Sequence, residues 1–389
     1  MSSDPHEAQQ HAPTDGGRVL LGAGTYDLDA HPRFRVVLEG MRARGWAVEE
    51  IVEPLAFDTK QRVEALQHAS QLPRLAVALA RAWTRLIPRL RRRRRRSPRV
   101  DVVAVGHLGH FDVGLVRRLT RPAPVVLDYL VSGTGTAADR RVGGGPRLRA
   151  LALLDRYALS RADVVVVDTQ ENLRALDEQF QPRAVVIPVG ADGRWFEAGR
   201  RASQQSGLDG LSVVFFGLFT PLQGTAVIGA ALRALAGSVR ATIVGTGQDE
   251  PEVEALLAGV PNVSRIPWVR ADDLPALVAG HDVCLGIFGT GAKAQLVVPN
   301  KVYQGAAAGC AVVTSDTAPQ RRALGENAVY VPQGDAVALA DALRALAADG
   351  ARLRALRTAT REHAERCFTP ERVVAPLDER LRSLRGDGR

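Results

Sequence analysis

Short runs of apolar, often β-branched residues alternate along the chain with longer segments in which apolar residues recur at helical spacing. This alternation predicts parallel β-strands joined by helices, because strands covered on both faces read as continuous apolar runs. In the first half the predicted strands are residues 18–24, 46–52, 101–106, 124–130, 163–169 and 184–190. In the second half they are residues 212–219, 241–247, 263–269, 282–289, 311–316 and 328–333. The pattern therefore predicts an α/β protein with two Rossmann-like, doubly wound parallel-sheet domains that face a cleft.

The chain divides where this pattern is interrupted. Residues 192–210 are polar and without a period, so we expect a linker over residues 191–210. The expected domains are an N-terminal one over residues 18–190, a C-terminal one over residues 211–368, and a last helix over residues 369–389 that returns to the N-terminal domain. Residues 1–17 lack the apolar core of a signal peptide, and we expect a disordered leader there. Ligands of open parallel sheets bind at the carboxyl ends of the strands, so the cleft is the expected active site.

One segment departs from the layered pattern. Residues 73–87 are a predicted amphipathic helix, which we expect Pro88 to end, and an arginine-rich run, residues 89–99, follows. The apolar stripe and the arginines opposite it are Leu75, Leu79, Trp83 and Leu86, and Arg74, Arg81 and Arg85. Three interpretations are open: a helix docked on the sheet with a solvated arginine loop after it, contact of residues 73–99 with an anionic membrane surface, or contact with nucleic acid.

Composition narrows these choices. The chain has 389 residues, 46% hydrophobic and 24% charged, as expected of a globular protein with two or three domains. Its net charge of +9 is local, because residues 89–99 hold eight arginines and no acid, which leaves the rest of the chain at +1. A basic face spread over a domain, as in nucleic-acid-binding proteins, is not indicated, and we expect no nucleic-acid partner.

Cysteines, histidines and hydropathy point to an intracellular protein. Cys284, Cys310 and Cys367 lie in or near predicted buried elements and fit small apolar core residues. No apolar stretch free of charge reaches the roughly 18 residues that a membrane span needs. The eight histidines are scattered, without the spacing of metal ligands. We expect a cytoplasmic protein without a metal or other cofactor, peripheral at the inner face of the membrane if residues 73–99 bind lipid.

The most informative stretch is residues 297–316. Pro299 suits the first position of a helix, Gly309 suits the left-handed residue after its end, and residues 311–316 then form a buried strand. Backbone amides at the start of this helix form an anion site, with Asn300 and Lys301 beside it. A nucleoside diphosphate is the expected ligand.

Read in order, the motifs of the second half resemble the nucleotide-sugar domain of retaining glycosyltransferases with the GT-B fold, of the family 4 type. The motifs are residues 215–224, 243–257, 260–288, 297–316 and 334–356. Residues 162–169 and 185–192 resemble the end of the acceptor-side domain of that family. The resemblance covers residues 18–375. It implies a metal-independent enzyme that moves a sugar from a nucleotide-sugar co-substrate (a UDP-, GDP- or TDP-sugar) to an acceptor hydroxyl.

The chain departs from the family at two acidic positions. Most of these enzymes carry two glutamates eight residues apart, one before the helix that begins near Pro299 and one on it. Here those positions are Leu296 and Gln304. The Gln304 amide can still reach a ribose hydroxyl, whereas Leu296 cannot hydrogen-bond a sugar. The resemblance is therefore to a variant branch that lacks the paired glutamates.

A second departure concerns the cations that grip the diphosphate. The family tends to carry an arginine and a lysine after the first strand of the second domain. That region of this chain contains Phe219, Thr220 and Gln223 instead. Lys293 and Lys301 are the nearest replacements, and Lys293 is the first choice for a compensating cation.

Further residues that the resemblance places at the donor are glycines and one short segment. Gly217, Gly224 and Gly245 would let the backbone approach the nucleotide. Trp268 and Val269 lie where relatives meet the base.

In the first half, residues 22–33 follow the first strand. Gly24 allows close approach of a phosphate or sugar, or forms a tight turn. Tyr26 lies near the expected acceptor. Arg33 either reaches a phosphate or an acceptor carboxylate, or is a solvated arginine at a helix start.

Two later strands also end in candidate residues. His107 and His110 follow the third strand, and each accepts a proton from the acceptor hydroxyl, holds a sugar hydroxyl, or is a structural histidine. Asp128 follows the fourth strand, near where related enzymes often have a histidine that faces the cleft. It stabilises positive charge at the anomeric carbon, orients the acceptor, or caps a loop. Asp128 and His110 are the predicted catalytic residues.

The sequence thus predicts a retaining glycosyltransferase. The acceptor is a glycan or lipid-linked sugar, which the basic helix would suit, or a small secondary metabolite such as an aminocyclitol. The alternatives are a non-catalytic partner subunit with the same fold, motivated by the missing glutamates, and another GT-B enzyme such as a sugar-nucleotide epimerase.

Overall fold

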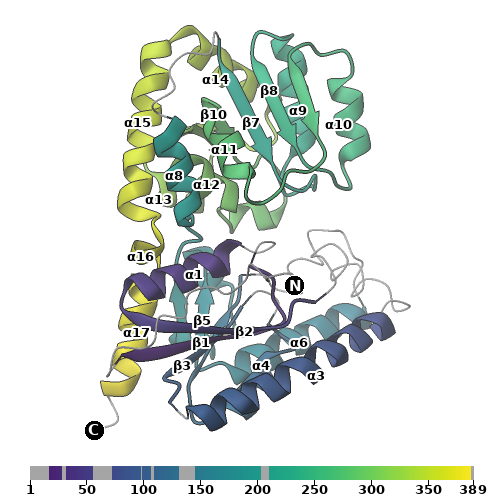
Figure 1. Ribbon diagram of the computed structural model, residues 1–389. Coiled ribbons are helices and arrows are strands. Elements are labelled where there is room, and N and C mark those ends of the chain that lie inside the picture. Colours follow the sequence, from purple (N-terminus) through teal and green to yellow (C-terminus); the bar gives the residue numbers. More distant parts are fainter. Residues whose placement is uncertain are drawn as a thin grey trace, which may run out of the picture.

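The computed structural model describes residues 17–28, 32–55, 72–97, 99–106, 109–130, 145–202 and 210–386. They form two α/β domains, each built on a parallel sheet of six strands (Figure 1). The predicted fold class is confirmed. The predicted leader lies outside the described residues, apart from Gly17.

The N-terminal sheet has the order β2-β1-β3-β4-β5-β6. Its strands are β1 (Arg18–Gly24), β2 (Trp46–Val52), β3 (Val102–Val105), β4 (Val125–Asp128), β5 (Val164–Val167) and β6 (Ala184–Val186). Each of the six predicted apolar runs contributes one strand. The last four strands are shorter than their runs, because the chain turns into loops at the carboxyl edge of the sheet.

The C-terminal sheet has the order β12-β11-β10-β7-β8-β9. Its strands are β7 (Ser212–Phe216), β8 (Arg240–Val244), β9 (Val263–Ile266), β10 (Val283–Leu285), β11 (Ala311–Ser315) and β12 (Val329–Val331). In both sheets the strand order reverses beside the first strand of the domain, at the topological switch point where ligands of such sheets bind.

Helices cover both faces of the N-terminal sheet. On one face, Leu86 and Leu90 of α3, Val116 of α4 and Leu159 of α6 share a core with β3, β4 and β5. On the other face, residues of α1, α16 and α17 share a core with β1, β3 and β5. The bounds are α1 (Pro32–Ala43), α3 (Leu72–Arg96), α4 (Val113–Thr120), α6 (Pro146–Arg161), α16 (Pro370–Val373) and α17 (Ala375–Gly386).

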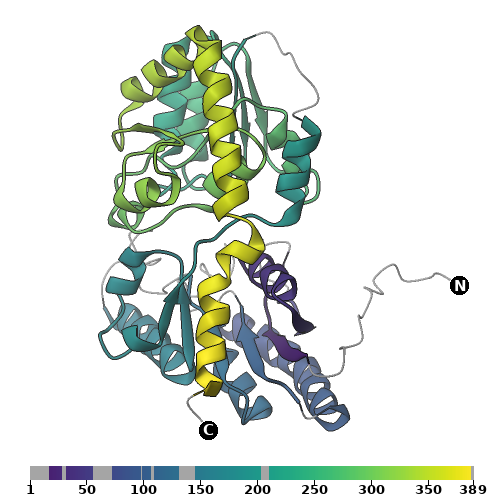
Figure 2. The same ribbon diagram turned by 90° about the vertical axis from the view of Figure 1, so that its left-hand side faces the viewer.

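The last part of the chain therefore packs against the first domain. Figure 2 shows α15 (Gly350–Cys367) beside the C-terminal domain, with α16 and α17 continuing along the N-terminal one. Asp378 of α17 accepts hydrogen bonds from Arg44 Nε at 2.6 Å and Trp46 Nε1 at 2.8 Å. These contacts attach the end of the chain to the start of β2.

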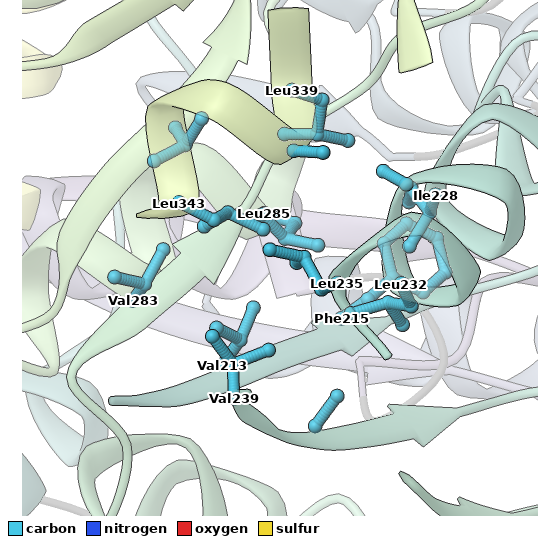
Figure 3. Packing of buried hydrophobic residues seen from close by; sticks show 14 of the residues in the cluster. Val213, Phe215, Ile228, Leu232, Leu235, Val239, Val283, Leu285, Leu339 and Leu343 are labelled. Carbon is cyan, nitrogen blue, oxygen red and sulfur yellow. The ribbon is translucent and has the colours of Figure 1, made fainter. Parts of the chain in front are cut away.

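The core of the C-terminal domain also has two halves. In one, α9 (Thr225–Leu235) and α14 (Ala336–Ala348) pack their leucines on β7, β8 and β10 (Figure 3). In the other, α8, α11 and α12 cover the opposite face. The bounds of the remaining helices of this domain are α8 (Gly193–Ala202), α10 (Glu250–Leu257), α11 (Leu274–Ala279), α12 (Asn300–Ala307) and α13 (Ala318–Leu324).

Two local predictions need correction. The expected linker contains α8, because Trp195 and Phe196 are buried in the core of the C-terminal domain and give the segment an apolar face. Pro88 does not end the helix that precedes it: α3 continues to Arg96, since Leu86 and Leu90 on either side of the proline are buried against the sheet. The arginine run is thus helical up to Arg96 and is not a loop.

The three cysteines are free thiols. Cys284 and Cys310 are buried in the C-terminal core, as predicted. Cys367, at the end of α15, is exposed instead. In the part of the chain that the structure describes, no helix is long and apolar enough to cross a membrane.

Candidate active site

Two glycines bring the carboxyl ends of β7 and β8 into direct backbone contact. Gly217 (φ +139°) and Gly245 (φ +131°) both have backbone conformations that other residues rarely adopt. A Cβ atom on Gly245 would lie 2.0 Å from the carbonyl oxygen of Gly217. A Cβ atom on Gly217 would lie 3.0 Å from Nζ of Lys301. At Gly217, the loop after β7 therefore presents only backbone atoms to the ammonium group of Lys301.

Lys301 is a buried cation in the first turn of α12. The residue is 5% exposed, and its ammonium lies 3.6 Å from the ring centroid of Phe215. Nζ donates a hydrogen bond to Oε1 of Gln223 at 2.5 Å. Burial lowers the pKa of Lys301 well below its usual value. None of the ion pairs among the described residues includes Lys301, so its charge has only a neutral amide and an aromatic face as partners.

The residue type itself is informative. The chain contains 51 lysines and arginines, and only Lys60, Lys293 and Lys301 are lysines. Two of the three thus fall within nine residues of the sequence. The ammonium of a lysine is more compact than the planar guanidinium of an arginine.

The start of α12 adds backbone donors to this site. Pro299 precedes the helix with an extended backbone (φ −72°, ψ 152°) and provides no side-chain cap. Amide groups at such an end carry the positive part of the helix dipole and are available to an anion. The prediction that Pro299 is the first helical residue is off by one position, and Gly309 has the expected left-handed conformation (φ +83°).

The other predicted donor residues differ in their exposure and in their packing. Asn300 and Thr220 are half-buried, and Gln304 is buried on α12. Lys293 lies in the 3-10 helix Ala292–Gln295, half-buried and with a polar or ionic interaction of its own. Gly224 directly precedes α9, and a Cβ there would lie 2.5 Å from the backbone of Phe288. The lack of a side chain at Gly224 therefore lets these two backbone segments pack closely. Of the pair after β9, Trp268 is 74% exposed and Val269 packs against the core.

The loop before α12 touches the N-terminal domain. The Thr169 hydroxyl, which follows β5, donates a hydrogen bond to the carbonyl of Leu296 at 2.6 Å. Glu171 in α7 (Gln170–Arg174) accepts two hydrogen bonds from Arg322 of α13, at 2.8 and 2.9 Å. The carboxyl end of β5 thus lies against the loop that precedes α12.

Arg33 and Asp128 form a buried ion pair at this edge. Arg33 Nε lies 2.7 Å from Asp128 Oδ1, and the residues are 2% and 4% exposed. A second nitrogen of Arg33 donates to the carbonyl of Ile187 at 3.3 Å. Arg33 Nη2 and Asp128 Oδ2 are buried without a hydrogen-bond partner. Asp128 is therefore neither a loop cap nor exposed to an acceptor, and Arg33 is not a solvated arginine.

The rest of this cluster was not predicted from the sequence. Asp168 follows β5 and accepts a hydrogen bond from Asn172 Nδ2 at 2.6 Å. Burial raises the pKa of Asp168, and the Arg33 charge opposes this shift. Burial also raises the pKa of Tyr303 on α12, and the neighbouring Asp168 carboxyl adds to the shift. The one signal in the sequence was an aspartate after an apolar strand, and its partner on α12 is 135 positions away.

Tyr26 and Gly24 belong to the core of the N-terminal domain. Tyr26 is 1% exposed, packs edge-to-face on Phe34 and has a buried hydroxyl without a hydrogen-bond partner. A Cβ on Gly24 would lie 3.1 Å from Asp112 Oδ2 and 3.3 Å from the Tyr26 ring. The predicted acceptor contact of Tyr26 is therefore wrong for this conformation, and the turn at Gly24 is filled by the protein itself.

His110 is also part of the packing. It is 4% exposed, lies 3.1 Å (Nε2) from Asp155 Oδ1 of α6 and 5.4 Å from Tyr129 between ring centroids. Its burial against α6 fits the structural alternative and leaves it no access to an acceptor hydroxyl. His107 lies outside the described residues. No group of three or more histidine, cysteine or acidic side chains within the described ranges is arranged to hold a metal ion.

Comparison with protein families identifies the second domain. Residues 210–349 match the family model "Glycosyl transferases group 1". The C-terminal domain is a group 1 glycosyltransferase domain. A comparison with curated protein sequences gave no match.

Solved structures extend the likeness to the whole chain. Sucrose-phosphate synthase from Thermosynechococcus elongatus is 16% identical with a TM-score of 0.68, over 96% of this chain and 100% of that one. Anabaena HepE, in complex with UDP and glucose, is 15% identical with a TM-score of 0.65, over 94% and 100%. A UDP-forming α,α-trehalose-phosphate synthase from Burkholderia vietnamiensis is 14% identical with a TM-score of 0.62, over 96% and 100%.

At these identities the structural likeness shows the fold, which is that of GT-B glycosyltransferases. The family match makes the C-terminal domain a glycosyltransferase domain, and the likeness to solved structures adds the fold of the whole chain. The glycosyltransferase domain contains β7, β8 and α12, so the buried Lys301 and the two contacting glycines lie within the matched residues.

Proposed function

We propose that this glycosyltransferase holds the diphosphate of a nucleotide sugar at the start of α12 and transfers the sugar to an acceptor hydroxyl with retention of configuration. The observation that carries the proposal is the buried ammonium of Lys301, which has no carboxylate partner among the described residues and lies next to the bare backbone of Gly217. A desolvated cation of this kind gains most from an anionic ligand.

Chemistry at this site would rest on charge stabilisation. When the bond to the sugar breaks, negative charge grows on the departing diphosphate. Helix amides and a fixed ammonium in a site shielded from water stabilise that charge without reorganisation. In this proposal Lys301 and the first amides of α12 take that role, Lys293 and Asn300 assist, and no metal ion or other cofactor takes part.

The donor base is proposed from the relatives. HepE has been solved with UDP and with UDP-glucose, and the trehalose-phosphate synthases are UDP-forming. We therefore place UDP-sugars before GDP- and TDP-sugars. Gln304 would bind a ribose hydroxyl through its amide, and the exposed Trp268 offers a face to the base.

For the acceptor, the proposed location is the carboxyl edge of the N-terminal sheet. The Arg33–Asp128 pair lies at this edge and would act by positioning, since both side chains are buried. One candidate acceptor is a glycan or lipid-linked sugar. Contact of residues 73–99 with an anionic membrane surface would place the enzyme next to such an acceptor. The other candidate is a small metabolite such as an aminocyclitol.

Calorimetric titration of the full chain with UDP, GDP and TDP tests the donor site. We expect one of them to bind, and Lys301→Met to weaken that binding. Arg240→Met is a matched control, because it removes a half-buried cation at the opposite, amino end of β8. Absence of binding by all three nucleotides would refute the proposed site. If a nucleotide binds but no nucleotide sugar is converted to free nucleoside diphosphate, the alternative of a non-catalytic partner subunit would be favoured.

A further inference from the structure

One layer of the N-terminal domain is strongly basic on its outer surface. The helices α3, α4 and α6 form this layer, since residues from all three pack on the same face of the sheet. Ten arginines lie in α3, two in α4 and four in α6. The one acidic residue in the three helices is Asp155, which is buried against His110. The layer therefore has no acidic side chain of its own at its surface.

Arginines continue along the whole length of α3. Arg74, Arg81, Arg85, Arg92 and Arg96 recur at intervals of seven and four, the spacing of one stripe on a helix. All five are exposed, and none takes part in the ion pairs recorded among the described residues. At about 1.5 Å per residue, the stripe is roughly 33 Å long.

The opposite stripe of α3 is docked on the protein. Leu75, Leu79, Leu86 and Leu90 are buried. Toward the end of the helix, Arg89 pairs with Glu53 and Arg93 with Glu49, beside β2. These contacts fix α3 on the domain, so the exposed arginines form a preformed surface and their helix does not depend on a partner to fold.

Apolar side chains project from the same layer. Leu153 and Tyr157 on α6 are 68% and 42% exposed and lie four residues apart, hence on one side of that helix. Val77 on α3 is 50% exposed. Leucine and valine side chains gain little from a sugar-phosphate backbone but partition into the boundary between headgroups and acyl chains of a bilayer. Basic and apolar groups together thus favour a lipid surface over nucleic acid.

We propose that the outer surface of α3, α4 and α6 docks flat on a bilayer that contains anionic phospholipids. This proposal does not depend on the donor site. The first half of α3 lies beside the loops that end β1 and β3, since Trp83 Nε1 donates to Asp112 Oδ1 at 2.8 Å and Asp112 accepts from the Thr25 amide at 2.7 Å. Docking would therefore hold the acceptor edge of the domain near the membrane surface.

Sedimentation with phospholipid vesicles tests the proposal. The full chain would be mixed with vesicles of phosphatidylcholine alone, or of equimolar phosphatidylcholine and phosphatidylglycerol, at low and high salt. The test variant replaces the five stripe arginines with glutamine: Arg74, Arg81, Arg85, Arg92 and Arg96. The control replaces five exposed arginines of the C-terminal half and has the same net charge: Arg233, Arg352, Arg354, Arg366 and Arg372.

We expect the wild type and the control to bind the anionic vesicles and to be released by salt, because screening shortens the reach of surface charges. Each arginine near an anionic surface contributes about 1 kcal/mol, so loss of all five lowers the partition coefficient by up to roughly 5,000-fold. Leu153→Ser with Tyr157→Ser should lower it several-fold at unchanged charge.

Four results would overturn the proposal. They are equal binding to neutral vesicles, a loss below about threefold in the stripe variant, an equal loss in the control, and no effect of the Leu153 and Tyr157 replacements. Binding to a DNA duplex that the stripe variant loses, without binding to vesicles, would assign the surface to nucleic acid instead. Circular dichroism and melting temperature establish that the variants are folded.

Discussion

Replacement of Lys301 by methionine should separate function from stability. Methionine keeps the length of the side chain and removes its charge. In the folded wild type the ammonium gains a cation–π contact with Phe215 and a hydrogen bond to Gln223. These contribute about 2 kcal/mol and about 1.5–3 kcal/mol in buried settings.

The cost of removing the ammonium from water is of similar size. The effective penalty for burying one ion is several kcal/mol, and the lowered pKa of Lys301 indicates that this cost exceeds the gains. We therefore expect the free energy of unfolding of Lys301→Met to lie within about 2 kcal/mol of the wild type. Donor binding should change much more. A charge-assisted hydrogen bond to a phosphate is worth about 2–3 kcal/mol, which corresponds to a roughly 30- to 150-fold weaker affinity for the nucleoside diphosphate.

The pH dependence gives an independent check. Burial lowers the pKa of Lys301 in the folded state, whereas the unfolded value is about 10.4. Between the two values the unfolded chain binds more protons, so the stability of the wild type rises with pH through this window relative to Lys301→Met. The affinity for a nucleoside diphosphate should fall as pH rises over the same window, because the anion binds the protonated amine.

Urea unfolding and calorimetric titration at several pH values measure both quantities. A variant that loses more than about 4 kcal/mol of stability would show that the lysine serves the fold. Nucleotide affinity equal to that of the wild type would show that the diphosphate binds elsewhere. Either result would refute the reasoning.

Two further predictions concern buried charges in the N-terminal domain. Asp128→Asn should lower the free energy of unfolding, measured by urea titration, by about 3 kcal/mol, because it leaves the buried Arg33 charge unpaired. The double variant Arg33→Met/Asp128→Leu should recover most of this loss. A single variant as stable as the wild type would contradict the burial of the pair. Burial alone would raise the pKa of Asp378, but hydrogen bonds from Arg382, Trp46 and Arg44 outweigh it and lower the pKa to about 2. The contribution of Asp378 to the free energy of unfolding should therefore be complete above the unfolded pKa of about 3.9 and be lost as pH falls through about 2. In acid unfolding, the stabilities of the wild type and of Asp378→Asn should then converge. A difference in their free energies of unfolding that stays constant between pH 5 and pH 2 would contradict this.

The sequence by itself determined the layered fold. All twelve predicted runs became strands, because a strand covered on both faces must be apolar along its length and thus leaves a continuous signal. The proposed anion site at the start of α12 would also be encoded locally: Pro299, Lys301 and Gly309 lie within eleven residues, and each would contribute through its own backbone position or charge.

Only the tertiary structure decided which polar residues meet. Arg33 and Asp128 are 95 positions apart, and Asp168 and Tyr303 are 135 apart, so no spacing in the sequence could pair them. Tyr26 and His110 were predicted to face the acceptor, yet both are buried, because the direction of a side chain after a strand depends on which helix packs over it. The same holds for α3: its period revealed an amphipathic helix, but the burial of Leu86 and Leu90 around Pro88 carried the helix through the arginine run. Neighbouring residues determine strands, helices and helix ends, whereas the burial and pairing of side chains depend on segments that meet only when the chain has folded.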